Sequence, residues 1–293
     1  DGRSDARWRN RRHHGDRLNK LDSGPIWRYG GKGLVAPKLI PHFAKAQLWA
    51  EPFFGAGGVF FQLPDRAYQR YAVNDLDSSI ITFFRVLRDR PDDLVRVCEL
   101  TPYAREEFIA CLPKSDDPLE EARRVWVRGR QGFAGVGNSW ARSINRWVAD
   151  PIETKLALLH TYAKALRNVA VDCIDAREFV QKWGGGEGVF LYNDPPYAPE
   201  ARTGESYEHE LTADDHRALA AELHAAVGRG AKVAVSGYPS ALYNELFAGW
   251  RTVEFDVALN GTRDATGMRR TEVLWMSYGE RDSIGGAKQK SLF

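Results

Sequence analysis

The residues best suited to chemistry form the string Asn193-Asp-Pro-Pro-Tyr197, which directly follows an apolar strand pattern over 188–192. Its two prolines lack N–H donors and have a fixed φ, so the turn is stiff and its carbonyls stay available as acceptors. Asp194 and the Pro195 carbonyl could accept the two N–H bonds of a planar amino group while Tyr197 stacks on its ring. A structural Pro-Pro loop is the alternative, but the complete string behind a buried strand favours a binding role.

A second candidate is the Gly-rich turn Glu51-Pro-Phe-Phe-Gly-Ala-Gly-Gly58. Its glycines have no Cβ, so the backbone can pass close to a ligand. Asp75 falls 20 residues after Gly55, at the end of the next strand pattern, where dinucleotide folds bind ribose hydroxyls with an acidic residue. The spacing is G-x-G-G and no Walker lysine follows, so the turn predicts a nucleoside cofactor without phosphates. An ordinary tight turn stays open as the alternative.

These two turns must be positioned by the elements around them. Strand patterns cover 47–53, 70–74, 169–174, 188–192 and 232–236, with a final antiparallel pair over 253–259 and 271–278. Helical patterns cover 35–43, 78–87, 105–111, 119–127, 152–166, 176–183 and 213–227, and 58–63 should open a further helix. Thr212 and Asp215 form a capping-box pattern before the last of these helices. The order predicts a doubly wound α/β sheet with helices on both faces.

Residues 122–147 form a basic segment with six arginines and no acidic residue, in a chain whose formal net charge is +2. Arginine binds phosphate and reads guanine edges, and the interleaved tryptophans and Phe133 can stack on or wedge between bases. A solvated basic surface with a few core tryptophans is the alternative. We expect Arg128 and Arg130 to include a phosphate contact, and Arg142 or Arg146 to approach a base edge.

Composition places the 293-residue chain among soluble globular proteins, with 43% hydrophobic and 27% charged residues. There is no apolar run of the roughly 18 residues that span a membrane, and no secretory signal pattern. Three scattered cysteines predict a reducing compartment, and hence a cytoplasmic location, and neither cysteines nor histidines have metal-ligand spacing. Residues 1–20 carry seven basic and three acidic side chains, which predicts a flexible basic arm or a disordered tail.

Together these segments resemble the Dam-like (D12 class) DNA adenine-N6 methyltransferases, which have a D-P-P-Y motif. Besides 194–197, the matching strings are Arg28-Tyr-Gly-Gly-Lys-Gly33, 51–60, Val73-Asn-Asp-Leu-Asp77, Tyr207-Glu-His-Glu-Leu211, Val235-Ser-Gly-Tyr238 and Glu272-Val-Leu-Trp275. They follow the family's order from about 26 to 278. Asp77 stands where the family has Asn, and Ala176 follows Asp175 where the family often has a Phe that packs on the cofactor adenine. The central region does not resemble the members that read G-A-T-C.

The resemblance implies an S-adenosylmethionine (SAM)-dependent methyltransferase fold, which is a Rossmann-like mixed sheet with a smaller, mainly helical DNA target-recognition insert. The expected parts are a basic arm (1–24), a SAM-binding catalytic domain (25–95 and 165–280), the insert (96–164) and a tail (281–293). The implied activity is transfer of a methyl group from SAM to N6 of an adenine flipped out of double-stranded DNA, without a metal.

The resemblance also assigns residues to roles. Catalytic roles fall to Asp194, Pro195, Pro196 and Tyr197. The implied SAM-binding residues are Trp27, Tyr29, Lys32, Glu51, Pro52, Phe53, Phe54, Gly55, Gly57, Asp75 and Asp175. Of these, Tyr29 and Lys32 are expected near the methionine end of SAM.

Two alternatives stay open. Related folds carry N/D-P-P-Y in methylases of RNA bases or protein glutamine, and a methylase fold that has lost activity would be a binding module. The Arg-Tyr-Gly-Gly-Lys element and the basic segment favour DNA, and the intact 194–197 string argues against lost activity. The DNA recognition sequence and the biological role (restriction–modification, phage or housekeeping) are not fixed by the sequence, and neither is the oligomeric state, for which a monomer is the expectation.

Overall fold

The computed structural model describes residues 21, 23–28, 30–132, 139–141, 149–197, 211–258 and 269–285. The strands in these residues form one seven-stranded sheet with the order β3-β2-β1-β4-β5-β7-β6. The strands are β1 (Leu48–Glu51), β2 (Arg70–Asn74), β3 (Val169–Asp172), β4 (Val189–Asn193), β5 (Lys232–Gly237), β6 (Arg251–Ala258) and β7 (Arg269–Met276). The first five are parallel, whereas β7 runs antiparallel between β5 and β6.

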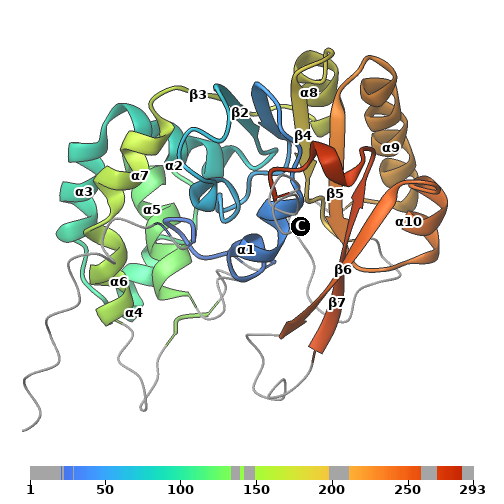
Figure 1. Cartoon of the computed structure of the whole chain (residues 1–293). Coiled ribbons are helices and arrows are strands. Elements are labelled where there is room, and N and C mark those ends of the chain that lie inside the picture. Colours follow the sequence, from blue (N-terminus) through green and yellow to red (C-terminus); the bar gives the residue numbers. More distant parts are fainter. Residues whose placement is uncertain are drawn as a thin grey trace, which may run out of the picture.

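Helices cover both faces of this sheet (Figure 1). The α-helices are α1 (Ala36–Leu39), α2 (Ser78–Asp89), α3 (Pro91–Glu99), α4 (Arg105–Ala110), α5 (Pro118–Gln131), α6 (Ala149–Leu156), α7 (Leu159–Leu166), α8 (Ala176–Trp183), α9 (Ala213–Gly228) and α10 (Ala241–Leu246). Short 3-10 helices are η1 (Lys32–Leu34), η2 (Ile40–His42), η3 (Phe60–Gln62) and η6 (Glu280–Asp282). The fold class predicted from the sequence is confirmed.

The side chains of each strand alternate between two hydrophobic cores, as the pleat of a strand requires. Trp49 of β1 packs into the core that includes α1, α2, α5 and α7, whereas its neighbours Leu48 and Ala50 pack into the core under α8, α9 and α10. The sheet is therefore buried on both faces, as parallel sheets usually are.

Helices α3 to α7 gather on one side of the molecule, where α5 and α7 pack against α2 (Figure 1). Within the described residues, no helix combines the length and apolar character needed to cross a membrane.

Most of the predicted elements are present, and β2 and α8 have the predicted bounds. The helix expected to open over 58–63 was wrong: only the 3-10 helix η3 forms there. Leu63 is extended (ψ 143°) because Pro64 follows it, and a residue before proline is sterically driven out of the helical region. Helices α3 and α10 were not predicted, although Pro91 at the first position of α3 is a recognised start signal.

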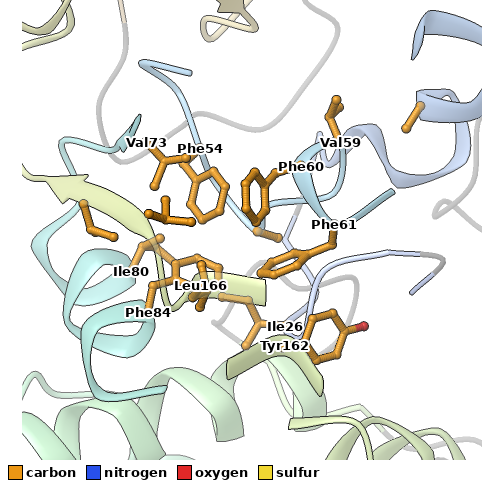
Figure 2. Packing of buried hydrophobic residues seen from close by; sticks show 14 of the residues in the cluster. Ile26, Phe54, Val59, Phe60, Phe61, Val73, Ile80, Phe84, Tyr162 and Leu166 are labelled. Carbon is orange, nitrogen blue, oxygen red and sulfur yellow. The ribbon is translucent and has the colours of Figure 1, made fainter. Parts of the chain in front are cut away.

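The glycine turn after β1 rests on a cluster of aromatic rings from η3, α2 and α7 (Figure 2). Phe54 packs on Phe84 with ring centroids 4.7 Å apart, and Phe61 packs on Tyr162 at 4.8 Å. Gly57 has a φ of +70°, and a Cβ there would lie 2.6 Å from Phe61. Glycine is therefore required at this position both by the backbone conformation and by the close approach of a ring.

Candidate active site

A pocket of about 330 Å³ opens at the carboxyl ends of β1, β2 and β4. The sheet order grows outward from β1 in both directions, to β2 on one side and to β4 on the other. In open α/β sheets the crevice at such a switch point is the usual ligand site. The volume is within the range of small-molecule sites. The two turns singled out in the sequence both line this pocket.

The glycine turn is tied to Asp75 at the end of β2. The Gly55 N–H donates to Asp75 Oδ2 at 2.7 Å, and the Asp77 N–H donates to Asp75 Oδ1 at 3.0 Å. Burial raises the pKa of Asp75, while the nearby Arg28 guanidinium and the two N–H donors act in the opposite direction. Gly55 has a φ of +51°, and a Cβ there would meet nothing within 4 Å.

Asn74, the residue before Asp75, holds the ends of three strands together. Its side-chain amide donates to the Pro52 carbonyl at 3.1 Å and to the Ile174 carbonyl at 3.0 Å, and its oxygen accepts the Ile174 N–H at 2.9 Å. The side chain is fully buried. Asn74 therefore fixes the loops after β1 and β3 relative to Asp75.

Asp194, directly after β4, has a hydroxyl and an ammonium at the same oxygen. Ser236 Oγ of β5 donates to Asp194 Oδ1 at 2.9 Å, and Lys32 Nζ lies 3.0 Å from that oxygen. Burial raises the pKa of Asp194, and the Lys32 ammonium and the hydrogen bonds from Lys32 and Ser236 lower it in part. Tyr192 shares a hydrogen bond of 2.9 Å with Ser236, so the carboxylate is backed by a buried polar network.

Lys32 of η1 lies between two carboxylates. Its Nζ is 3.0 Å from Asp194 Oδ1 and 3.0 Å from Glu272 Oε1 of β7, and it donates to the Tyr197 hydroxyl. Burial lowers the pKa of Lys32, but the two carboxylates outweigh this effect and hold the pKa well above its ordinary value. The buried side chain is therefore a charged ammonium at neutral pH.

Tyr197 is stacked on Tyr238, which follows β5. The ring centroids are 4.2 Å apart with an interplanar angle of 21°, and the Arg270 guanidinium lies 5.2 Å from the Tyr238 centroid. One face of Tyr197 is thus already covered. A further flat group would have to use its other face or separate the two rings.

Most of the residues assigned to the site from the sequence line this one pocket. These residues are Lys32, Glu51, Pro52, Phe53, Phe54, Gly55, Asp75, Asp175, Asp194, Pro195, Pro196 and Tyr197. Trp27 and Gly57 lie outside its lining, and Tyr29 lies outside the described residues. Lys32, expected beside the cofactor's methionine end, is bonded to the Asp194 turn.

The sequence did not assign Arg28, Tyr238 or Glu272 to the site. Arg28 lines the pocket and forms a 2.8 Å ion pair with Asp77, while Tyr238 stacks on Tyr197 and Glu272 lies 3.0 Å from Lys32. Each of the three lies within one of the strings that carry the family resemblance. Their location in these motifs could have marked the three residues as candidates, although it did not indicate what each one does.

Asp175 caps α8 and is paired with Arg177. Its Oδ1 accepts the backbone N–H of Arg177 at 2.8 Å, and the two carboxylate oxygens accept from the Arg177 guanidinium at 2.9 and 2.8 Å. This pairing lowers the pKa of Asp175. Ala176 offers no ring to the pocket, whose apolar lining also includes Leu76 and Leu219.

The described arginines of the basic segment make contacts inside the molecule. Arg128 donates to the Cys111 carbonyl and pairs with Glu121 at 2.8 Å, and Arg130 donates to the Pro25 carbonyl. Arg123 and Arg124 pair in turn with Glu120. These acidic partners lie just before the window of 122–147, so its charge count did not include them. Arg142 and Arg146 lie outside the described residues, and DNA contact by all four predicted arginines stays a prediction.

The described residues contain no group of three or more His, Cys, Asp or Glu side chains able to hold a metal ion.

Comparison with known proteins identifies one family and several relatives. Residues 29–258 match the model of the family described as D12 class N6 adenine-specific DNA methyltransferase. The type II methyltransferase M1.LlaDCHI of Lactococcus lactis subsp. cremoris is 28% identical over 89% of this chain and 98% of its own length. The DNA adenine methylase of Escherichia coli K12 is 25% identical over 74% of this chain and 81% of its own. The solved structure of the rRNA methyltransferase aviRa from Streptomyces viridochromogenes aligns with 90% of this chain and 93% of its own, with 14% identity and a TM-score of 0.40.

Proposed function

The chain belongs to the D12 class of N6 adenine-specific DNA methyltransferases, and from this premise we propose which residues carry the methyl transfer. The family's reaction is SAM-dependent methylation of adenine in DNA. The observation that carries the residue assignment is that the glycine turn with Asp75 and the Asp194–Tyr197 turn line one pocket.

The chemistry of the pocket supports SAM as its ligand. Glu51, Asp75 and Asp175 line it, and carboxyl groups can accept hydrogen bonds from the sugar hydroxyls, amine and adenine amino group of SAM. The open space at Gly55 allows a ligand to approach the backbone closely. We assign the ribose to Asp75 and the adenine end to Asp175, with Leu76 and Leu219 as the apolar surface in place of the missing Phe. When bound, SAM supplies an electrophilic methyl group on its sulfonium.

Asp194 and the Pro195 carbonyl act on the amino group of adenine. The N6 lone pair is delocalised into the ring, so the amino group is a poor nucleophile at rest. Two acceptors on its N–H bonds localise that lone pair as positive charge develops on nitrogen, which stabilises the transition state more than the ground state. The methylated nitrogen loses its extra proton after the transfer. Much of the remaining rate enhancement comes from holding N6 and the methyl group in line.

Tyr197 provides a flat surface for the adenine ring. The target atom lies inside a duplex, so we propose that the base is flipped out and stacks on this ring. Tyr238 covers one face of Tyr197 at 4.2 Å, so the base either stacks on the opposite face or enters between the two rings.

We assign recognition of double-stranded DNA to the helical insert of 96–164, between the two parts of the catalytic domain. Arg128, Arg130, Arg142 and Arg146 are its proposed contacts with DNA. Arginine has five N–H donors, so the two internal bonds of Arg128 leave donors for a phosphate. We further propose that the enzyme acts as a monomer in the cytoplasm.

The test is methyl incorporation from labelled SAM into duplex DNA, RNA and protein by the purified chain. We expect label in duplex DNA alone and N6-methyladenine after digestion to nucleosides. Label in RNA or in glutamine would support the alternative methylases, and binding of SAM without any transfer would indicate lost activity. Sequencing the methylated bases in a host that expresses the chain gives the recognition sequence.

A further inference from the structure

Glu272 is a buried carboxylate on β7 to which the reaction above assigns no role. It is 3% exposed, and its strand neighbours Val273, Leu274 and Trp275 are core residues. A charge inside a protein is costly unless a partner compensates for the lost water. The partner is Lys32, whose Nζ lies 3.0 Å from Glu272 Oε1.

Lys32 is shared between Glu272 and the catalytic turn. Its Nζ is also 3.0 Å from Asp194 Oδ1, so the ammonium lies at equal distance from two carboxylates, one directly after β4 and one on β7. With all three groups ionised, the cluster carries one net negative charge. Lys32 additionally donates to the Tyr197 hydroxyl, so the position of the ammonium also affects the stacking ring.

The reaction places a second demand on Asp194. Lys32 lies at Asp194 Oδ1, and during the transfer the other oxygen, Oδ2, accepts a hydrogen bond from the adenine amino group. As positive charge develops on N6, the single negative charge of Asp194 serves both the ammonium and this nitrogen, so Asp194 alone would hold Lys32 less firmly. A second carboxylate that stays in place keeps the ammonium in position.

We propose that Glu272 is a positioning residue: it holds the Lys32 ammonium in place while Asp194 accepts a hydrogen bond from adenine N6. The inference rests on the role proposed for Asp194.

The first test compares Glu272→Gln with Glu254→Gln, the same change at an exposed position on the adjacent strand β6. At saturating SAM and DNA, Glu272→Gln should slow single-turnover methylation about 10-fold to 100-fold, since misplacing a group near the reacting atoms by about 1 Å can cost 10²-fold. SAM affinity should change less than about 3-fold, because Asp75 and the glycine turn are untouched. Glu254→Gln should behave as wild type.

The pH profile separates an electrostatic role from a merely structural one. The titratable groups that face Lys32 are Asp194, Glu272, Tyr197 and Tyr192. Removing the charge of Glu272 lowers the pKa of Lys32, because one of the two carboxylates that raise it is lost. As the pH rises into the alkaline range, the Glu272→Gln rate should therefore begin to fall at a lower pH than the wild-type rate.

A double variant shows whether Glu272 acts through Lys32. Lys32→Met with Glu272→Gln should methylate at the residual rate of Lys32→Met alone, and this comparison decides the matter even if Glu272→Gln alone fails to fold. A wild-type rate and pH profile for Glu272→Gln would overturn the proposal, as would a further loss in the Lys32→Met background. Wild-type formation of N6-methyladenine in the same assay keeps the family reaction separate from these outcomes.

Discussion

Replacing Asp194 by asparagine should remove most of the methyl transfer and leave SAM binding nearly intact. The side chains have the same shape, so the asparagine oxygen can still accept from Ser236 Oγ and Lys32 Nζ, which both lie at Asp194 Oδ1. Within the described residues, no hydrogen bond is made to Oδ2. That oxygen is the acceptor we assign to adenine N6, and in asparagine an NH₂ donor takes its place.

The expected loss follows from two effects at the same atom. A hydrogen bond to a charged acceptor is worth about 1.5–3 kcal/mol. In the variant this bond is lost, and the NH₂ group of asparagine faces the adenine amino group, so that two donors oppose each other. The carboxylate charge that stabilises positive nitrogen is lost as well, and removal of one such preorganised group typically costs about 2.7–4 kcal/mol, or 10²-fold to 10³-fold in rate. Glu272 still pairs with Lys32, so the fold should persist.

Single-turnover transfer from tritiated SAM to duplex DNA measures the rate, and calorimetry measures the SAM Kd. The matched control is Asp282→Asn, because Asp282 pairs with Lys232 at 2.8 Å but has no contact with the pocket. The control should transfer at the wild-type rate. If Asp194→Asn also transfers within about 3-fold of wild type, the transition-state role assigned to Asp194 is wrong.

Three further predictions concern the cofactor, the basic segment and pH. Asp75→Ala should weaken SAM binding by about 1.5–3 kcal/mol by calorimetry, with little effect on the rate at saturating SAM, and an unchanged Kd would refute the ribose assignment. Arg128→Gln and Arg130→Gln should each lower the Tm, because the carbonyl that each arginine bonds loses its donor. At least one of the two should also reduce the slope of log affinity for DNA against log salt concentration by about one. If both slopes are unchanged, the two residues have structural roles only. Burial raises the pKa of Asp194, so the methylation rate should fall on the acidic side of its pH profile at a pH above the ordinary aspartate pKa of about 3.9. Lys32→Met removes a cation that lowers this pKa, so it should move the acidic fall to a still higher pH. An acidic fall at the same pH in Lys32→Met would contradict the pairing of Lys32 with Asp194.

The sheet and its two functional turns could be predicted because their signals are local. Each parallel strand contains a short apolar run, and the turns carry proline or glycine at positions that fix the backbone. The capping box of Thr212 and Asp215 is an example: both of its hydrogen bonds are present at the start of α9. Parallel strands then bring their carboxyl ends to one edge of the sheet, so a pocket at that edge follows from topology.

Partners of charged residues could not be predicted in the same way. The basic segment has no acidic residue within 122–147, but a helix places side chains three and four positions apart side by side. Arg124 therefore pairs with Glu120, which a linear window leaves out. The partner of Arg130 is less accessible still, because the Pro25 carbonyl is more than 100 positions away in the sequence.

Lys32 is an example of a residue whose predicted role changes once its ion-pair partners are known. Its motif predicts a residue near the cofactor, and a lone lysine there would bind an anionic group of a ligand. The fold instead places it 3.0 Å from Asp194 and 3.0 Å from Glu272, whose strands β4 and β7 are separated in the sheet by β5. The ammonium therefore belongs to the protein's own carboxylates. Its effect on the reaction comes through the charge and position of Asp194, so substitutions of Lys32 should alter the pH dependence of the transfer more than the affinity for SAM.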